Sequence, residues 1–113
     1  MTTDAPDPTH APAIRSINGR KYDISRCKLI ASYADDPAKI PVDFCAAERL
    51  YLSPQKIWIL RGEGGPFTQW QKPGPAGTIH AGAGILRLSR DQARDWLVHR
   101  GLFLIADEYG LVR

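Results

Sequence analysis

Residues 49–60 have the pattern of an apolar hairpin with a polar turn at residues 53–56, and they run directly into the glycine-rich residues 61–66. One strand register gives a favourable partner at every rung: Leu52 opposite Ile57, Tyr51 opposite Trp58, Leu50 opposite Ile59 and Glu48 opposite Arg61. Aromatic and opposite-charge pairs of this kind stabilise an antiparallel ladder. Because residues 57–60 are apolar on both faces, we expect this strand to be central in its sheet and covered on each side.

Length and composition limit the class of protein. A chain of 113 residues is long enough for one domain that folds without disulfides or bound metal. No apolar run has the length of a membrane span or of a signal peptide's apolar core, so we expect a soluble, cytoplasmic protein with no membrane partner. Cys27 and Cys45 lack the spacing and the neighbouring histidines of a zinc site, which indicates reduced thiols and predicts no metal or cofactor.

The net charge of +3 suits a polyanionic partner, such as nucleic acid or an acidic protein face. The basic residues are scattered along the chain rather than clustered, however, and this favours an ordinary solvated surface over a nucleic-acid footprint.

The predicted organisation is a disordered tail at residues 1–13 and one domain at residues 14–113. The tail is rich in Pro, Thr and Ala and offers too little apolar surface to offset the entropy of ordering it. Asn18-Gly19 suits a type I′ turn and predicts a short hairpin, and the alternating pattern of residues 27–33 predicts a strand. Residues 62–84, rich in Gly and Pro, are predicted to form one long loop, which in a compact domain is usually functional or mobile.

One helix is predicted near the C-terminus. Ser89 and Gln92 have the spacing of a capping box, so the helix should occupy residues 90–100, with Gly101 as the residue after its end. Its core face would consist of Ala93, Trp96 and Leu97.

Residues 84–88 are predicted to form a short strand before this helix, and residues 102–105 suit either a last strand or a second helical turn. The expected fold class is therefore α+β: a mainly antiparallel sheet of four to five strands, with the helix packed on one face through Trp96 and Leu97.

The candidate partner-binding side chains are Arg61, Glu63, Phe67, Trp70, Lys72, Arg87, Arg90 and Arg94. Phe67 and Trp70 carry the most weight, since aromatic residues often dominate binding energy. In a Gly/Pro-rich loop such rings either fold back onto the core or are offered to a partner, and both alternatives stay open. Trp58 and Trp96 lie at apolar positions of regular elements and are predicted to be core residues.

No catalytic signature is present. Residues 62–65 lack the Lys-Ser/Thr of a phosphate-binding loop and indicate turn chemistry instead. An enzyme would need Glu63 to meet His80 in a pocket, or one of the two cysteines to meet His80 or His99. The sequence therefore predicts no catalytic residue and favours a protein that is not an enzyme.

The helix arginines also have two interpretations. Arg90 and Arg94 lie one turn apart and would form a basic stripe with Arg87. Asp91 and Asp95 lie beside them, which favours a self-paired, solvated helix face over phosphate contact.

Several segments taken together carry a family resemblance: NGRKYD at residues 18–23, Leu50-Tyr51, IWILRGEGGP at residues 57–66, ILRLS at residues 85–89 and ARDWL at residues 93–97. They resemble a family of small bacterial proteins of unassigned function, often encoded on phages and other mobile elements, with the patterns NGKxYD, LYrTkkGxWFLyGEGGP and PLTxEEAxxWL. Small mobile-element proteins of this sort include anti-CRISPR proteins, so the resemblance implies an inhibitor of host defence.

The expected function is that of a small non-enzymatic protein-binding module, an inhibitor whose partner is a protein or ribonucleoprotein such as a host nuclease complex. The alternative is a basic nucleic-acid-binding module. Binding to nucleic acid with an affinity that falls steeply as the salt concentration rises would distinguish this alternative from the protein-binding module.

Overall fold

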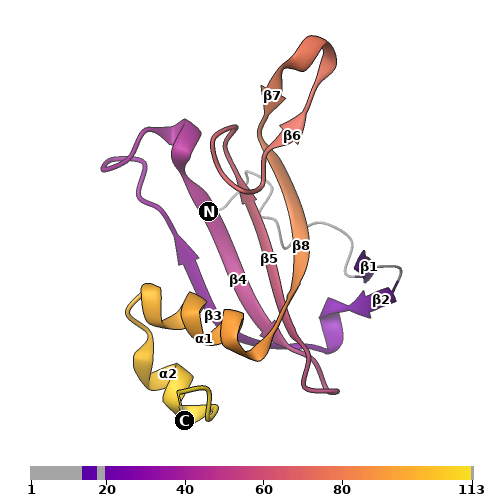
Figure 1. Ribbon diagram of the computed structural model, residues 1–113, viewed down its shortest axis with the longest axis vertical. Coiled ribbons are helices and arrows are strands. Elements are labelled where there is room, and N and C mark those ends of the chain that lie inside the picture. Colours follow the sequence, from indigo (N-terminus) through magenta and orange to yellow (C-terminus); the bar gives the residue numbers. More distant parts are fainter. Residues whose placement is uncertain (1–13, 18–19, 113) are drawn as a thin grey trace.

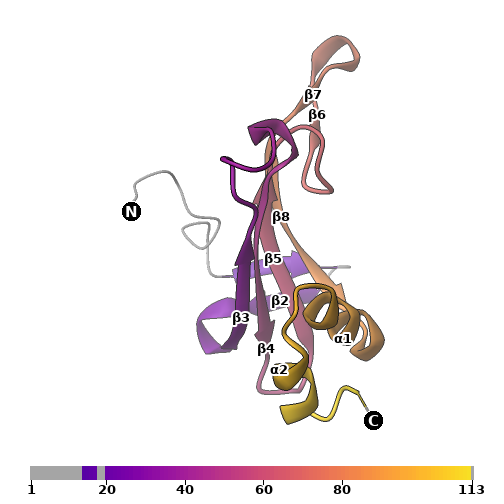
Figure 2. The ribbon, with the colours of Figure 1, turned by 90° about the vertical axis from the view of Figure 1, so that its left-hand side faces the viewer.

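The computed structural model describes residues 14–17 and 20–112, and its centre is a four-stranded antiparallel sheet in the order β3-β4-β5-β8 (Figure 1). These strands are β3 (Lys28–Ala34), β4 (Ala46–Leu52), β5 (Trp58–Gly64) and β8 (Gly82–Leu88). The C-terminal helices α1 (Arg90–His99) and α2 (Phe103–Glu108) pack on one face of the sheet (Figure 2). The predicted α+β class is confirmed.

Two small hairpins and three 3₁₀ turns complete the described chain: β1 (Ile14–Ile17), β2 (Arg20–Asp23), β6 (Lys72–Pro73), β7 (Ile79–His80), η2 (Ile24–Arg26), η3 (Val42–Phe44) and η4 (Pro75–Gly77). In the first hairpin Ile17 pairs with Arg20, which agrees with the prediction of a hairpin here. Its proposed turn residues, Asn18 and Gly19, lie outside the described residues, as does the predicted disordered tail at residues 1–13.

The β4–β5 hairpin differs from the predicted register by one residue. Its observed pairs include Leu52 with Trp58, Tyr51 with Ile59, Leu50 with Leu60 and Glu48 with Gly62. The predicted pairing of Glu48 with Arg61 is therefore wrong. A shift of one residue changes the partner at every rung and moves each β5 side chain to the other face relative to β4. Trp58, expected on the face of Tyr51, therefore lies on the face of Leu50 and Leu52.

The turn explains this shift. The Ser53 N–H donates to the Ile57 carbonyl, and the Lys56 N–H donates to the Ser53 carbonyl, each at 2.9 Å. Lys56 has a φ of 67°, in the left-handed region. This is the three-residue loop in which a type I turn is followed by a left-handed residue. Ser53 and Ile57 close the hairpin, so the loop is one residue shorter than predicted.

The core lies mainly on the helix side of the sheet. Its buried members are Leu50, Trp58, Leu60, Trp70, Ala93, Trp96, Leu97, Ala106 and Leu111. A smaller cluster of Ile24, Tyr51 and Ile59 covers the other face. Strand β5 is thus central and covered on both faces, as predicted, and Trp58 and Trp96 are core residues.

Helix α1 begins and ends where its sequence predicts. The Ser89 hydroxyl accepts from the Gln92 N–H at 3.1 Å, and the Gln92 side chain accepts from the Ser89 N–H at 2.8 Å. Gly101 has a φ of 74°, as expected of the residue after a helix end. Of the two alternatives for residues 102–105, the structure shows the helical one, because Leu102 is the N-cap of α2 and residues 103–105 are its first turn.

Residues 62–84 do not form one long loop, which corrects the prediction. Strand β5 continues to Gly64, β6 pairs with β7, and β8 begins at Gly82. Of the glycines in this segment only Gly77 has a positive φ. The other glycines are therefore not required by a left-handed backbone conformation.

Candidate functional site

Trp70 is a core residue, which corrects the expectation that its ring is available to a partner. Its side chain is 5% exposed. The ring packs against Gly62 and Gly84, which face each other on β5 and β8. A Cβ atom at Gly62 would lie 2.4 Å from the indole, so a side chain at this position would occupy the space that Trp70 fills.

The Trp70 indole is held by a buried carboxylate, Glu48, which is 3% exposed. Four donors converge on the two oxygens of Glu48: Trp70 Nε1 and Gln69 Nε2 donate to Oε2, each at 2.8 Å, while Trp96 Nε1 and an Arg100 Nη donate to Oε1 at 2.7 and 2.8 Å. A carboxylate is tolerated in a core only with such complete pairing. We call these five residues the Glu48 hub.

Arg100 completes the hub from the end of α1. Its guanidinium lies 4.5 Å from the Trp96 ring centre and 5.0 Å from that of Tyr33, and it donates to the Trp96 carbonyl at 3.2 Å. The hub therefore ties β4, the segment after β5 and α1 together. Sequence reasoning missed this role, although the period of two along β4 places Glu48 on the same face as Leu50 and indicates burial.

Phe67, in contrast, lies on the surface. It is 58% exposed and packs against Phe44, which is 52% exposed, with ring centroids 5.0 Å apart. Val42 and Ile40, in the same segment as Phe44, are also exposed. We call Ile40, Val42, Phe44 and Phe67 the Phe44–Phe67 surface.

Main-chain contacts hold this surface in place. The Phe67 N–H donates to the Asp43 carbonyl at 3.0 Å, and the Gly65 N–H donates to the Cys45 carbonyl at 3.1 Å. A Cβ atom at Gly65 would lie 2.5 Å from the Asp43 carbonyl oxygen. The glycine permits the close approach of two backbones, and this fixes Phe67 beside Phe44.

A groove of about 430 Å³ lies beside the Phe44–Phe67 surface, between η3, the end of β5 and the start of β8. Its ionisable carboxylates come from Asp35, Asp43 and Glu63, and no Lys or Arg lines it. Glu63 is thus the one member of the predicted set that lines this groove. The lining of this groove is acidic, although the chain as a whole is basic.

The predicted basic residues do not join Phe67 in one surface. Arg61 is 3% exposed and lies on the sheet face away from the helices, opposite Arg49 in the strand pairing, so its placement beside the loop aromatics is wrong. Lys72 lies in β6. Arg94 pairs with Asp91 at 3.4 Å and with Asp95 at 3.1 Å, as the self-paired interpretation predicts.

Arg90 lines a different cavity, which lies beside Trp58, and Arg87 borders that cavity from β8 with its side chain on the opposite face of the sheet. They therefore belong neither to the groove nor to the Phe44–Phe67 surface.

The pairings that an enzyme would need are not formed within residues 20–112. Glu63 lines the groove, whereas the His80 ring contacts the Thr78 hydroxyl at 3.0 Å in the β6–β7 hairpin. No three His, Cys, Asp or Glu side chains of the described residues are placed to hold a metal ion.

The pKa of each cysteine thiol is raised above its ordinary value. Burial raises the pKa of the Cys27 thiol, and the nearby Asp23 raises it further. Burial also raises the pKa of the Cys45 thiol, with added contributions from Asp35 and Asp36.

We therefore expect Cys27 and Cys45 to react slowly with iodoacetamide. The thiolate is the nucleophile, so a raised pKa lowers the reactive fraction at any given pH and moves the pH–rate profile to higher pH. Peptide-level mass spectrometry from about pH 7 to pH 10 measures this shift across the ordinary thiol pKa of about 8.5. Urea-unfolded protein is the control. A folded-state profile at or below the unfolded one would contradict the prediction.

Comparison of the chain with models of known protein families, with curated proteins and with solved structures finds no match in any of the three. The resemblance to small mobile-element proteins stays a prediction. In the part of the chain that the structure describes, no helix has the length and apolar character needed to cross a membrane.

Proposed function

We propose that this chain is a small protein-binding module that acts by stoichiometric contact rather than by catalysis, with the Phe44–Phe67 surface as its contact site. The observation that carries the proposal is the contact between the rings of Phe44 and Phe67, both more than half exposed and both held by main-chain hydrogen bonds. Contiguous exposed apolar side chains are typical of interaction sites.

Binding energy is available at this surface. Burial of a phenylalanine side chain stabilises by about 1.5–3 kcal/mol relative to leaving it exposed. Because the hydrogen bonds from Phe67 and Gly65 already order the two loops, little conformational entropy remains to be lost when a partner binds.

The groove beside the surface indicates the chemistry of the partner. Its carboxylates favour a protein segment with apolar side chains next to Lys or Arg. Nucleic acid is a poorer match to this groove. The predicted arginines are divided between the sheet face away from the helices, which carries Arg61 and Arg87, and helix α1, which carries Arg90 and Arg94. Within the protein-binding class, the family resemblance favours a host defence complex as the partner.

Phe67→Ala is expected to abolish partner capture, whereas Phe103→Ala is not. Phe103, 54% exposed in α2, matches Phe67 in residue type and exposure but lies away from the groove. Tagged wild-type protein and both variants are incubated with a lysate of the source organism, and captured proteins are quantified by mass spectrometry. A protein enriched by wild type and Phe103→Ala, and lost with Phe67→Ala, is then purified.

Calorimetry with that purified protein completes the test. We expect Phe67→Ala to weaken binding at least about tenfold, which corresponds to about 1.4 kcal/mol. Phe103→Ala should change the affinity less than about twofold, in line with most residues outside a hot spot. Equal capture by the two variants would contradict the proposed site.

A further inference from the structure

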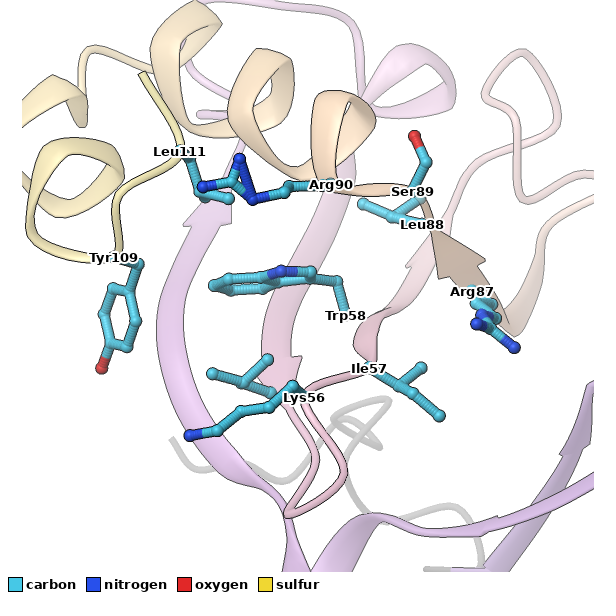
Figure 3. Close-up of a pocket in the computed structure, with 10 residues that line it drawn as sticks. Lys56, Ile57, Trp58, Arg87, Leu88, Ser89, Arg90, Tyr109 and Leu111 are labelled. Atoms are coloured by element: carbon cyan, nitrogen blue, oxygen red, sulfur yellow. The ribbon is translucent and has the colours of Figure 1, made fainter. Parts of the chain in front are cut away.

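A second cavity lies at the other end of the sheet, where the β4–β5 turn meets the start of α1 and the C-terminal segment (Figure 3). It has a volume of about 730 Å³, within the usual range for small-molecule sites. We call it the Trp58 pocket. Trp58, Leu88 and Leu111 supply apolar walls, while Lys56 and Arg90 supply cationic groups. Arg87 also borders the pocket, but it pairs with Ile59, so its side chain lies on the opposite face of the sheet from Trp58.

The charge of this pocket has one sign. Its lining contains the cationic side chains of Lys56 and Arg90 and no Asp or Glu. In Figure 3 the Trp58 indole lies between the Arg90 side chain on one side and the Lys56 side chain on the other. The ring of Tyr109 meets Trp58 edge-on, with centroids 5.7 Å apart, and the Lys28 ammonium lies 5.6 Å from the centre of the Tyr109 ring. A ligand here would meet aromatic surface and positive charge together.

Arg90 is positioned rather than free. Its guanidinium donates to the Gly110 carbonyl, which ties the start of α1 to the C-terminal segment. The Arg90 charge therefore stays beside the pocket, because its side chain is anchored on the segment that carries Leu111.

Lys56 has an unfavourable backbone conformation in the β4–β5 turn. Its φ of 67° is a conformation that Gly and Asn adopt readily, whereas other L-residues pay about 1–2 kcal/mol. Turn geometry therefore gives no reason for a lysine at this position. Its position on the pocket lining gives such a reason, because the ammonium group adds to the positive charge of the pocket.

We propose that the Trp58 pocket binds a small anion with an apolar body. The carboxylate, sulfonate or phosphate group is held by the cationic side chains, and the apolar part lies against Trp58 and Leu88. This site is separate from the Phe44–Phe67 surface and does not depend on the function proposed for that surface.

The probe pair for the test is 1-anilinonaphthalene-8-sulfonate and its neutral analogue N-phenyl-1-naphthylamine. Fluorescence titration of the sulfonate should give saturable binding to the wild-type protein, with at least about tenfold weaker binding of the neutral analogue, the ratio that corresponds to about 1.4 kcal/mol. Similar affinities for the two probes would overturn the proposal.

Lys56→Gly is the decisive variant, because glycine relieves the positive φ and should leave the protein at least as stable as the wild type. We expect it to weaken sulfonate binding at least about fivefold and to leave the neutral probe unaffected. Lys39→Gly, at another exposed turn lysine, is the matched control and should bind as the wild type does. Phe67→Ala should also bind as the wild type does, which separates this site from the other surface. Equal loss in the Lys56 and Lys39 variants would overturn the assignment.

Displacement of the bound sulfonate identifies the class of natural ligand. Displacement by adenosine monophosphate assigns a ring-bearing phosphate, and displacement by dodecanoate assigns an aliphatic carboxylate. Either result supports the proposal, and displacement by neither at millimolar concentration would contradict it.

Discussion

Glu48→Ala is expected to lower the free energy of unfolding by about 3–5 kcal/mol, the cost of removing one partner from a buried charged pair. The substitution leaves the Trp70 and Trp96 N–H groups and the Arg100 guanidinium without their buried acceptor. Urea denaturation followed by tryptophan fluorescence measures the change. The loss should be large because several donors, rather than one, lose the same partner.

Glu108→Ala, at an exposed carboxylate of α2, is the matched control and should change stability by less than about 0.5 kcal/mol. If Glu48→Ala does not fold, Trp96→Phe tests the same hub more gently. It removes one donor and should cost about 1–2 kcal/mol. A loss below about 1 kcal/mol in Glu48→Ala would show that the hub adds little to stability.

Gly62→Ala and Gly84→Ala are expected to have opposite effects, although the two glycines face each other across β5 and β8. A Cβ atom at Gly62 would lie 2.4 Å from the Trp70 ring, and one at Gly84 would lie 3.5 Å from it, an ordinary contact. Glu48 holds the indole, so the ring cannot retreat without losing its hydrogen bond. Gly62→Ala should therefore destabilise by about 2–3 kcal/mol, as overpacked cores do.

Gly84→Ala should be neutral or stabilise by up to about 1 kcal/mol, because alanine reduces the conformational entropy of the unfolded chain. Thermal and urea unfolding of the two variants, measured side by side, supply the test. The Gly62 variant should also show red-shifted tryptophan emission as Trp70 becomes exposed. Equal effects at the two positions would rule out the close packing of Trp70 on β5.

Local signals predicted a large part of the fold. The capping box of α1 and the glycine after it depend on residues close together in sequence, and both are formed as expected. The central position of β5 follows from its own apolar composition. The hairpin register failed by one residue, because a lysine in the left-handed conformation closed a shorter loop than its sequence indicates.

The candidate sites were harder to predict, since they depend on contacts between distant residues. Glu48 receives its donors from Gln69, 21 positions away, and from Arg100, 52 positions away. The burial of Trp70 depends on Gly62 and Gly84, which no local pattern relates to that ring. The alternation of Gly62 with Gly64, and of Gly82 with Gly84, is the signal that would have revealed two strands lacking side chains on one face.

The way Trp70 fills the sheet also decides where the chain can be engineered. Shortening the connection between β5 and β8 to a tight turn would remove Trp70 and leave a cavity in the core. The tip of the β6–β7 hairpin, at Pro75–Gly77, projects beyond the end of the sheet (Figure 1) and is exposed, with no neighbour within 4 Å of a Cβ atom built on Gly77. An epitope or fluorophore inserted there would report on the protein from outside its packed interior.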